Sequence, residues 1–370
     1  MKPAIARVLQ GLRGDTFFQI LLVGLLVLGA LSPVRLADYP ALVDWPTISA
    51  LTGLLLLTKG LELSGALQHL GHRWVAAMAT ERAVALSLVL AAAALSTVLT
   101  NDVALFVVVP LTLGVCRITG LPATKLVVFE ALAVNAGSAL TPIGNPQNLF
   151  LWQLAKVSFG EFVWHQLPLV AGLMLALVVL TLLSFTSRPM HVSEDDAEPL
   201  DTRLLVLSLA LYVPFLVAAD IGHASWAVAV LLATFALVRP QVVLDLDWGL
   251  LLVFVLMFVD LRLLAQLPGV RGAMAGLGLD QATHLYWASI GASQVISNVP
   301  AAIALAEYSR DWRVIAYGVN VGGFGLMVGS LANLIALRMV GDARAGRTFH
   351  AYAVPALVVA AVLGYGLLFL

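Results

Sequence analysis

The chain has 370 residues, of which 61% are hydrophobic and 11% charged, with a formal net charge of −1 at pH 7. Soluble domains contain about 25% charged residues, so this composition indicates an integral membrane protein. The small net charge argues against a nucleic-acid partner, and the single cysteine, Cys116, excludes an intrachain disulfide.

Apolar segments of helix-forming composition predict transmembrane helices rather than a β-barrel, whose strands alternate over about ten residues. In chain order the predicted helical segments are 17–31, 46–63, 84–99, 103–115, 126–139, 149–157, 167–185, 204–219, 224–238, 248–264, 285–296, 299–306, 314–327, 334–340 and 352–370. The short ones cannot cross a bilayer alone, because a spanning helix needs about twenty apolar residues.

Polar clusters separate these short segments. The first cluster is Thr100, Asn101 and Asp102, and the second runs over 141–148 and contains two prolines, which interrupt helices. Irregular polar backbone at membrane depth is tolerated where it is buried in protein or lines a cavity. Short arms joined at a polar tip predict re-entrant hairpins, and arms flanking a longer cluster predict broken helices. The predicted hairpins are 84–115 and 285–306, and the predicted broken helices are 126–157 and 314–340.

The two halves of the chain share landmarks in the same order, which indicates an internal repeat. Asn135–Leu149 aligns without gaps on Asn320–Leu334, Thr100-Asn101 aligns on Ser297-Asn298, and Asp44-Trp45 aligns on Asp247-Trp248. The predicted units are a first repeat over 1–187, an acidic loop and linking helix over 188–223, and a second repeat over 224–370.

Hairpins that do not cross leave five crossings before the second repeat, so the second repeat is predicted to be inverted. The predicted fold class is therefore an all-α polytopic membrane protein with two inverted-topology repeats, each with a re-entrant hairpin and a broken helix. With a cytoplasmic N-terminus, thirteen of the twenty Lys and Arg residues fall on the cytoplasmic side and five outside. This bias favours that orientation and predicts a multi-pass membrane protein with a cytoplasmic N-terminus.

Half-helices whose N-termini meet at the midplane expose unpaired N–H groups and can hold an anion without a fixed cation. The expected substrate-binding residues are Thr100, Asn101, Asn148, Ser297, Asn298 and Asn333. The expected coupling-ion residues are Asp102, Thr141, Gly144, Asn145, Gly329 and Ser330. The alternative is that these side chains cap helix ends, as Asn and Ser commonly do. Repetition of the set in both halves favours a binding site.

Asp102 has no acidic counterpart in the second repeat, because Val299 follows Asn298. A carboxylate at this depth must pair with a cation or hold a proton, which predicts a carrier of the coupling proton or a Na⁺ ligand. The alternative is an N-cap for the following helix.

Other charged residues lie in or near apolar segments. Lys59 and Glu62 are spaced to pair on one helix face, whereas Asp260 and Arg262 each need another partner. Glu130 is the second functional candidate. No nucleophile–base pair, metal-ligand spacing or phosphate loop is present in the sequence, so we expect no enzyme activity and no cofactor beyond a coupling H⁺ or Na⁺.

The motifs LTNDVALF, TPIGNPQN, ISNVP and NVGGFGLMVGSLANL resemble the ion transporter superfamily, which includes citrate and dicarboxylate carriers, arsenite permeases and Na⁺/H⁺ antiporters. The whole chain resembles the YbiR-type bacterial inner-membrane proteins. The resemblance implies inverted repeats, an elevator-type movement and a homodimer. The carboxylate carriers usually have Ser-Asn-Thr at both tips, whereas Asp102 and Val299 stand at the third positions here. Asn101-Asp102 at the first tip is more similar to the arsenite permeases and Na⁺/H⁺ antiporters, and the difference between the tips favours proton coupling through Asp102.

The sequence therefore predicts a secondary active transporter of a small anion, a carboxylate or an oxyanion, coupled to H⁺ or Na⁺. The alternatives are a Na⁺/H⁺ antiporter, an arsenite or antimonite exporter and, more remotely, an ion channel. The expected partners are the anionic solute, membrane lipid and a second copy of the chain.

Overall fold

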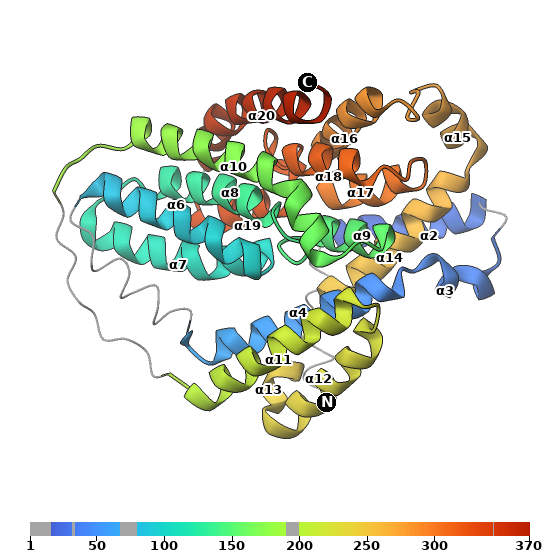
Figure 1. The fold of residues 1–370 in the computed structure, drawn as a ribbon, viewed down its shortest axis with the longest axis horizontal. Coiled ribbons are helices and arrows are strands. Elements are labelled where there is room, and N and C mark those ends of the chain that lie inside the picture. Colours follow the sequence, from blue (N-terminus) through green and yellow to red (C-terminus); the bar gives the residue numbers. More distant parts are fainter. Residues whose placement is uncertain (1–15, 32–33, 67–79, 190–199, 343) are drawn as a thin grey trace. The chain divides into compact units, whose positions relative to one another are not determined.

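The computed structural model describes residues 16–31, 34–66, 80–189, 200–342 and 344–370, and this part of the chain is almost entirely helical (Figure 1). The elements are α2 (Thr16–Leu31), η1 (Leu36–Asp38), α3 (Tyr39–Leu42), α4 (Trp45–Leu63), α6 (Glu81–Val98), α7 (Asn101–Thr119), α8 (Ala123–Ser138), α9 (Pro146–Ala155), α10 (Phe159–Ser184), α11 (Thr202–Asp220), α12 (Ala224–Val238), α13 (Pro240–Leu244), α14 (Trp248–Gln266), α15 (Pro268–Ala275), α16 (Ala282–Ile296), α17 (Asn298–Ala306), α18 (Trp312–Val321), η2 (Met327–Gly329), α19 (Leu331–Val340) and α20 (Ala345–Phe369).

This is the all-α polytopic fold with two inverted repeats that the sequence predicts. The arms of both hairpins and of the first broken helix lie within four residues of their predicted positions, whereas α18 ends six residues before the predicted end of its segment. The largest difference is α10, which begins eight residues before the predicted segment because Ser158 caps its N-terminus by accepting a hydrogen bond from Glu161 N at 3.2 Å. The acidic part of the predicted loop, 194–198, lies outside the described residues.

Five described helices are long and apolar enough to cross a membrane, and the bent pair Leu36–Leu42 and Trp45–Leu63 makes up to six. The five are α6, α10, α11, α14 and α20. α6 was expected to be a short hairpin arm, but Thr80 caps it by accepting a hydrogen bond from Ala83 N and lengthens it to 18 residues. Helix length therefore does not by itself distinguish a hairpin arm from a crossing here. The number of crossings and the orientation of the N-terminus stay predictions.

The described helices form two compact units, and each unit takes corresponding helices from both halves of the sequence. Unit 1 contains α2 to α4, α11 to α15 and the end of α17. Unit 2 contains α6 to α10, α16, the beginning of α17 and α18 to α20. Both hairpin tips and both helix breaks therefore belong to unit 2.

In unit 1, the Asp-Trp landmarks of the two repeats adopt the same local structure. The Asp44 and Asp247 side chains cap α4 and α14 by accepting a hydrogen bond from the backbone N–H three residues ahead, at 3.0 and 2.9 Å. The following Trp45 and Trp248 donate their indole N–H to the carbonyl oxygen five residues back, at 2.9 and 3.0 Å. These matching contacts support the repeat alignment.

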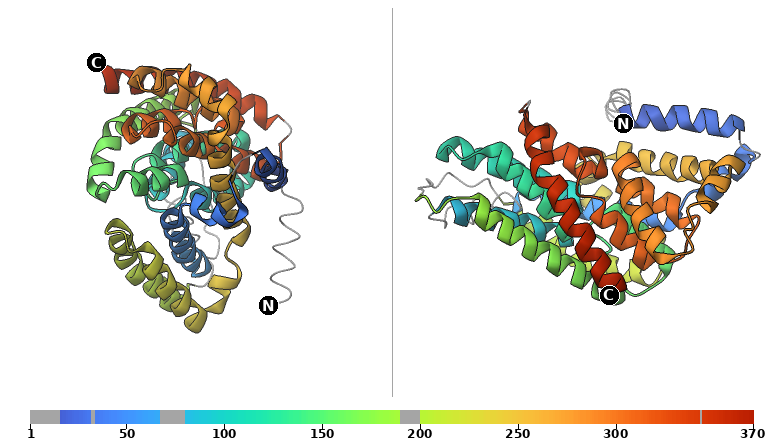
Figure 2. Two further views of the ribbon diagram at one scale, coloured as in Figure 1. Left: turned by 90° about the vertical axis from the view of Figure 1, so that its right-hand side faces the viewer. Right: turned by 90° about the horizontal axis from the view of Figure 1, so that it is seen from above.

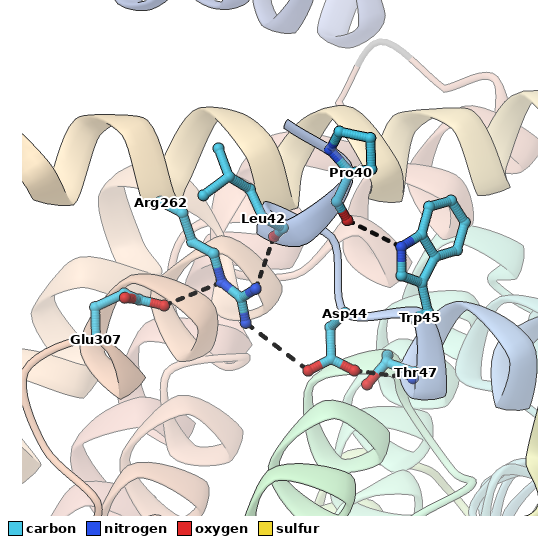
Figure 3. Close-up of polar contacts among 7 residues, drawn as sticks. All are labelled: Pro40, Leu42, Asp44, Trp45, Thr47, Arg262 and Glu307. Atoms are coloured by element: carbon cyan, nitrogen blue, oxygen red, sulfur yellow. Dashed lines mark hydrogen bonds and ion pairs between the residues drawn. The ribbon is translucent and has the colours of Figure 1, made fainter. Parts of the chain in front are cut away.

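Arg262 on α14 joins three segments of unit 1 (Figure 3). Its guanidinium donates to Leu42 O at 2.7 Å and to Glu307 Oε1 at 3.2 Å, and lies 3.8 Å from Asp44 Oδ2. Lys59 pairs with Glu62 at 2.6 Å, as predicted from their spacing. Asp260 is buried, and its Oδ1 has no hydrogen-bond partner within the described residues.

Unit 2 contains two similar sets of helices, one from each repeat, and the second arm of each broken helix packs against the set of the other repeat. α6 and α7 pack on α8 in the first set, and α16 packs on α18 in the second (Figure 1). The second arm of each broken helix packs on the first arm of the other, so α19 contacts α8 and α9 contacts α18. α20, dark red in Figure 2, packs against α8, α10 and α18.

Candidate functional site

The first helix break connects α8 to α9 and is shaped by two asparagines. Asn145 caps α9 by accepting a hydrogen bond from Asn148 N at 2.9 Å, with Pro146 at the first helical position. The Asn148 amide donates to the carbonyl oxygens of Ser138, Ala139 and Thr141 at 3.3, 3.0 and 3.1 Å. Both side chains therefore satisfy backbone groups that the break leaves exposed.

The second break connects α18 to α19 through η2 and is held by Gln294 from α16. The Gln294 Nε2 donates to Gly322 O at 2.6 Å and to Phe324 O at 3.1 Å, and its Oε1 accepts from Leu326 N at 2.8 Å. One amide side chain thus serves the three backbone groups that start this connection. Gln294 is a structural counterpart of the asparagines in the first break, supplied from a different helix.

The two breaks are joined by a reciprocal pair of amide hydrogen bonds. Asn135 Nδ2 on α8 donates to Asn333 Oδ1 on α19 at 2.7 Å. Its counterpart, Asn320 Nδ2 on α18, donates to Asn148 Oδ1 on α9 at 2.8 Å. A contact made in the same way from each repeat to the other is what a two-fold relation between them requires. The four amides form the centre of the candidate site.

The first hairpin tip is tied to the first break. α7 begins at Asn101, whose backbone N–H donates to Gly144 O at 2.9 Å. The Thr141 hydroxyl donates to Thr97 O at 2.6 Å, on the other side of the tip. Asp102 lies in the first turn of α7, one residue beyond the helix start, so it is not the N-cap. Its negative charge there is favourable to the helix dipole.

The second hairpin tip contains a strained residue. Ser297 has φ +72° and ψ 156°, a region that is essentially restricted to glycine. The matched residue of the first tip, Thr100, has φ −66° and is unstrained. Such outliers persist only where the surrounding structure enforces them, and they cluster at functional sites.

The second hairpin tip and the four paired asparagines lie close together at Gly323. A Cβ atom at Gly323 would lie 3.4 Å from Asn298 Nδ2 and 3.5 Å from Asn135 Oδ1. Asn298 and Asn135 are both buried. The amide of the second tip and the amide of the first repeat therefore face the same glycine, which links a hairpin tip with the reciprocal pairs.

Matched glycines let the hairpins approach the broken helices closely. A Cβ on Gly137 would lie 2.2 Å from Ala93 O and 2.6 Å from Ser96 Oγ. A Cβ on Gly322 would lie 2.4 Å from Ser293 Cβ. Ser96 and Ser293 are matched positions of the two hairpins, so both repeats use a glycine–serine contact to set the distance between hairpin and break.

Three buried oxygen atoms near the tips and breaks have no hydrogen-bond partner in the part of the chain that the structure describes. They are Thr100 Oγ1 at the first tip, Gln147 Oε1 on α9 and Ser330 Oγ at the start of α19. Buried polar groups are rarely left unsatisfied, so these atoms are candidates for contact with a ligand or an ion.

All the residues that the sequence analysis assigned to the site lie in unit 2. Those buried are Thr100, Asn101, Thr141, Gly144, Asn145, Asn148, Asn298, Gly329, Ser330 and Asn333, and those half-buried are Asp102 and Ser297. Among the described residues, the only buried charged side chains are Glu130 and Asp260, so no buried cationic side chain serves the site. The described residues also contain no group of three or more His, Cys, Asp or Glu side chains that could hold a metal ion.

Comparison with protein families matches residues 16–312 to the citrate transporter family CitMHS. The chain belongs to the citrate transporter family. It is 47% identical to the inner membrane protein YbiR of Escherichia coli over 97% of both chains. It is 31% identical to an uncharacterized transporter of Methanocaldococcus jannaschii, over 90% of this chain and 92% of that one.

The fold of this CitMHS protein is similar to that of the YdaH transporter of Alcanivorax borkumensis, whose crystal structure reveals an unusual topology. The TM-score is 0.57 with 16% sequence identity, and the likeness covers 95% of this chain and 96% of the other. At this identity the likeness concerns the fold alone.

Sequence reasoning missed several residues of the candidate site in this CitMHS member. Asn135 and Asn320 were used only as repeat landmarks, although their recurrence among apolar residues was the signal that could have identified them. Gln147 donates to Asn320 Oδ1 at 3.3 Å and was noted only as part of a polar cluster. Gln294 stands three residues before the second tip, and its long polar side chain in an apolar arm was the available signal.

Proposed function

We propose that this citrate transporter family protein is a secondary active transporter of a small anion, a carboxylate or an oxyanion, coupled to H⁺ or Na⁺. The observation that carries the proposal is the reciprocal pair of amide bonds, Asn135 to Asn333 and Asn320 to Asn148, at the meeting point of two broken helices. Asn135, Asn148 and Asn333 also satisfy carbonyl groups of the breaks. The buried oxygens of Thr100, Gln147 and Ser330 have no partner among the described residues, so polar groups remain available to a solute.

The solute would bind at the two hairpin tips, through Thr100, Asn101, Ser297 and Asn298. The helices α7, α9, α17 and α19 begin at the tips and breaks, and their first N–H groups and dipoles favour a negative charge. Asn148 and Asn333 already donate hydrogen bonds to protein groups. In this conformation they would therefore stabilise the site without binding the solute themselves. An anion bound by neutral donors does not require a fixed cation.

The coupling ion would bind near the breaks. The proposed residues are Asp102, Thr141, Gly144, Asn145, Gly329 and Ser330. Na⁺ prefers oxygen ligands, and the unpartnered oxygens of Thr100, Gln147 and Ser330 add three that no described protein group occupies. Coupling by H⁺ would instead use the Asp102 carboxylate at the first tip.

The proposed movement is of elevator type, with unit 2 carrying the site as one body within a homodimer in the bacterial inner membrane. The grouping of both tips and both breaks in a single compact unit supports this movement. The N-terminus is proposed to be cytoplasmic. Single-cysteine variants at exposed residues such as Asp220 and Arg239, labelled from either side of intact cells, test the orientation, with the buried Cys116 replaced by Ala.

Uptake into proteoliposomes tests the function. Purified protein is reconstituted with an imposed H⁺ or Na⁺ gradient and offered labelled citrate, succinate, phosphate and arsenate. Gradient-dependent accumulation of at least one anion is expected, and its loss in Asn101→Ala and Asn298→Ala would connect it to the tips. Absence of flux for every anion under both gradients would contradict the proposal, provided that the protein elutes as a folded species.

A second candidate is export of an uncharged oxyacid such as arsenous or antimonous acid. It is favoured by the absence of a buried cationic side chain among the described residues, because a neutral hydroxylated solute suits amides that both donate and accept. The chain is also 30% identical to the silicon efflux transporter LSI3 of rice over 144 residues, which is 39% of this chain and 30% of that protein. Arsenite accumulation in inverted vesicles, unaffected by competing carboxylates, would select this candidate.

A further inference from the structure

Glu130 is a buried carboxyl group outside the tips and breaks. It lies on α8 and is fully buried, with a relative exposure of 0%. The hydroxyl of Thr112 on α7 donates a hydrogen bond to its Oε1, whereas its Oε2 is buried and has no partner among the described residues. A carboxylate buried without a cation is far more costly than a neutral carboxyl group, so this site favours a bound proton.

Among the described residues, no cationic side chain pairs with Glu130. α8 packs against α6, α7, α10, α19 and α20. On these helices, Cys116 of α7 is the titratable side chain within electrostatic reach of Glu130 in the described structure, and it follows Thr112 by one helical turn. No described Lys, Arg or His side chain forms an ion pair with Glu130.

The second repeat indicates that the carboxyl group is not needed for packing. The alignment of Asn135 on Asn320 places Ile315 of α18 at the position that corresponds to Glu130. Ile315 is also fully buried. The same helix position therefore accepts an aliphatic side chain, and a carboxyl group that costs free energy in the first repeat needs a reason other than the architecture.

We propose that Glu130 is a proton-binding site of unit 2, which holds a proton while its carboxyl group is buried between α7 and α8 and releases it when water reaches the group. The inference rests on the proposed function and assigns its H⁺ coupling to a second carboxyl group besides Asp102. Thr112 acts as the positioning residue, because its hydroxyl holds Oε1 in place and leaves Oε2 to carry the proton.

Infrared difference spectroscopy of the reconstituted protein during a pH titration tests the proposal without a substrate. The wild type is expected to show a carboxylic C=O band that declines as the pH is raised, and Glu130→Gln should lack it. Asp260→Asn, which removes the buried carboxyl group of unit 1, is the matched control and should keep this band. Glu130→Ile, which copies the second repeat, serves if the glutamine variant does not fold.

A titrating band in Glu130→Gln and Glu130→Ile that is unchanged from the wild type in position and intensity would overturn the proposal, because no part of the band would then belong to Glu130. So would a Glu130 band of constant intensity across the titration, since a permanently protonated group carries no proton. Because the measurement needs no transported solute, failure of the uptake assay leaves this result standing. Conversely, confirmed uptake with a constant Glu130 band would refute the inference alone.

Discussion

Asn135 Nδ2 donates to Asn333 Oδ1 at 2.7 Å, between two residues that are 198 positions apart in the sequence. Asn135 also donates to Gly323 O at 3.1 Å, and Asn333 donates to the same oxygen at 2.9 Å. The bond therefore closes a triangle between α8, α19 and the turn that follows α18. Because the Asn320 to Asn148 bond repeats it in the other direction, each repeat stabilises the break of the other.

Removing one member of the pair should destabilise the protein. Asn135→Ala and Asn333→Ala each leave a buried amide partner unsatisfied, at a cost of about 1–3 kcal/mol. The double variant should lose less than the sum of the two, because its second substitution removes an already orphaned group. Apparent melting temperatures in detergent measure this coupling. Asn135→Ala combined with Asn148→Ala is the control and should be additive; a non-additive control would show that the two pairs form one network.

The matched glycine contact predicts a strong effect of a single methyl group. Gly137→Ala should prevent folding or lower the yield sharply, because the added Cβ would lie 2.2 Å from the backbone oxygen of Ala93, which cannot move aside alone. Gly291→Ala on α16 meets no atom within 4 Å and should be neutral or stabilise by about 0.5–1 kcal/mol through helix propensity. Size-exclusion profiles of the two variants check this; equal behaviour would contradict the close approach of α6 and α8.

Substitutions of Ser297 can separate the effect of its backbone strain from the effect of its side chain. Ser297→Gly should raise the apparent melting temperature, because glycine adopts φ +72° without the strain of about 1–3 kcal/mol. Ser297→Ala keeps the strain and should not raise it. Thr100→Gly has no strain to relieve and should lower stability. If the glycine variant at Ser297 is no more stable than the alanine variant, the tip geometry is wrong.

Arg262 should matter more than its counterpart in the first repeat. The alignment of Asp44 on Asp247 places Lys59 at the corresponding position. Arg262→Gln loses bonds to Leu42 O and Glu307 and should cost about 1–3 kcal/mol (Figure 3). Lys59→Gln loses one partly exposed pair with Glu62 and should cost about 0.3–0.5 kcal/mol. Thermal unfolding at low and high salt compares them, and similar losses would contradict the structural role of Arg262.

Asp102 tests the coupling. Asp102→Asn keeps the size of the side chain and removes the charge, so gradient-driven accumulation should be lost while folding is retained. Exchange of labelled for unlabelled anion at zero gradient should persist, because the remaining tip donors are unchanged. A variant that still concentrates its solute along an H⁺ gradient would assign the coupling proton elsewhere, and combining it with Glu130→Gln then identifies the other carboxyl group.

The positions of the hairpins and broken helices were predictable because their signals are local. Pro142 lies in the connection after α8 and Pro146 is the first residue of α9, where its missing N–H is tolerated. The Asp44 and Asp247 caps act on the next three residues. The repeat followed from residue spacing alone, and the structure adds matching cap and glycine geometry. The spacing of Lys59 and Glu62 likewise fixed their ion pair, since both lie on one helix face.

The sequence by itself determined the membrane class, the order of the elements and the polar residues at the tips and breaks. Only the tertiary structure decided that Asn135 pairs with Asn333, that Gln294 holds the second break and that Arg262 joins Asp44 and Glu307. It also decided that Glu130 Oε2 is buried without a hydrogen-bond partner among the described residues. The reason is physical. Helix breaks and caps depend on residues that are close in the sequence, whereas the hydrogen-bond partners of a side chain depend on which helices pack together. The sequence contains several buried asparagines, and their order along the chain does not tell which of them pair.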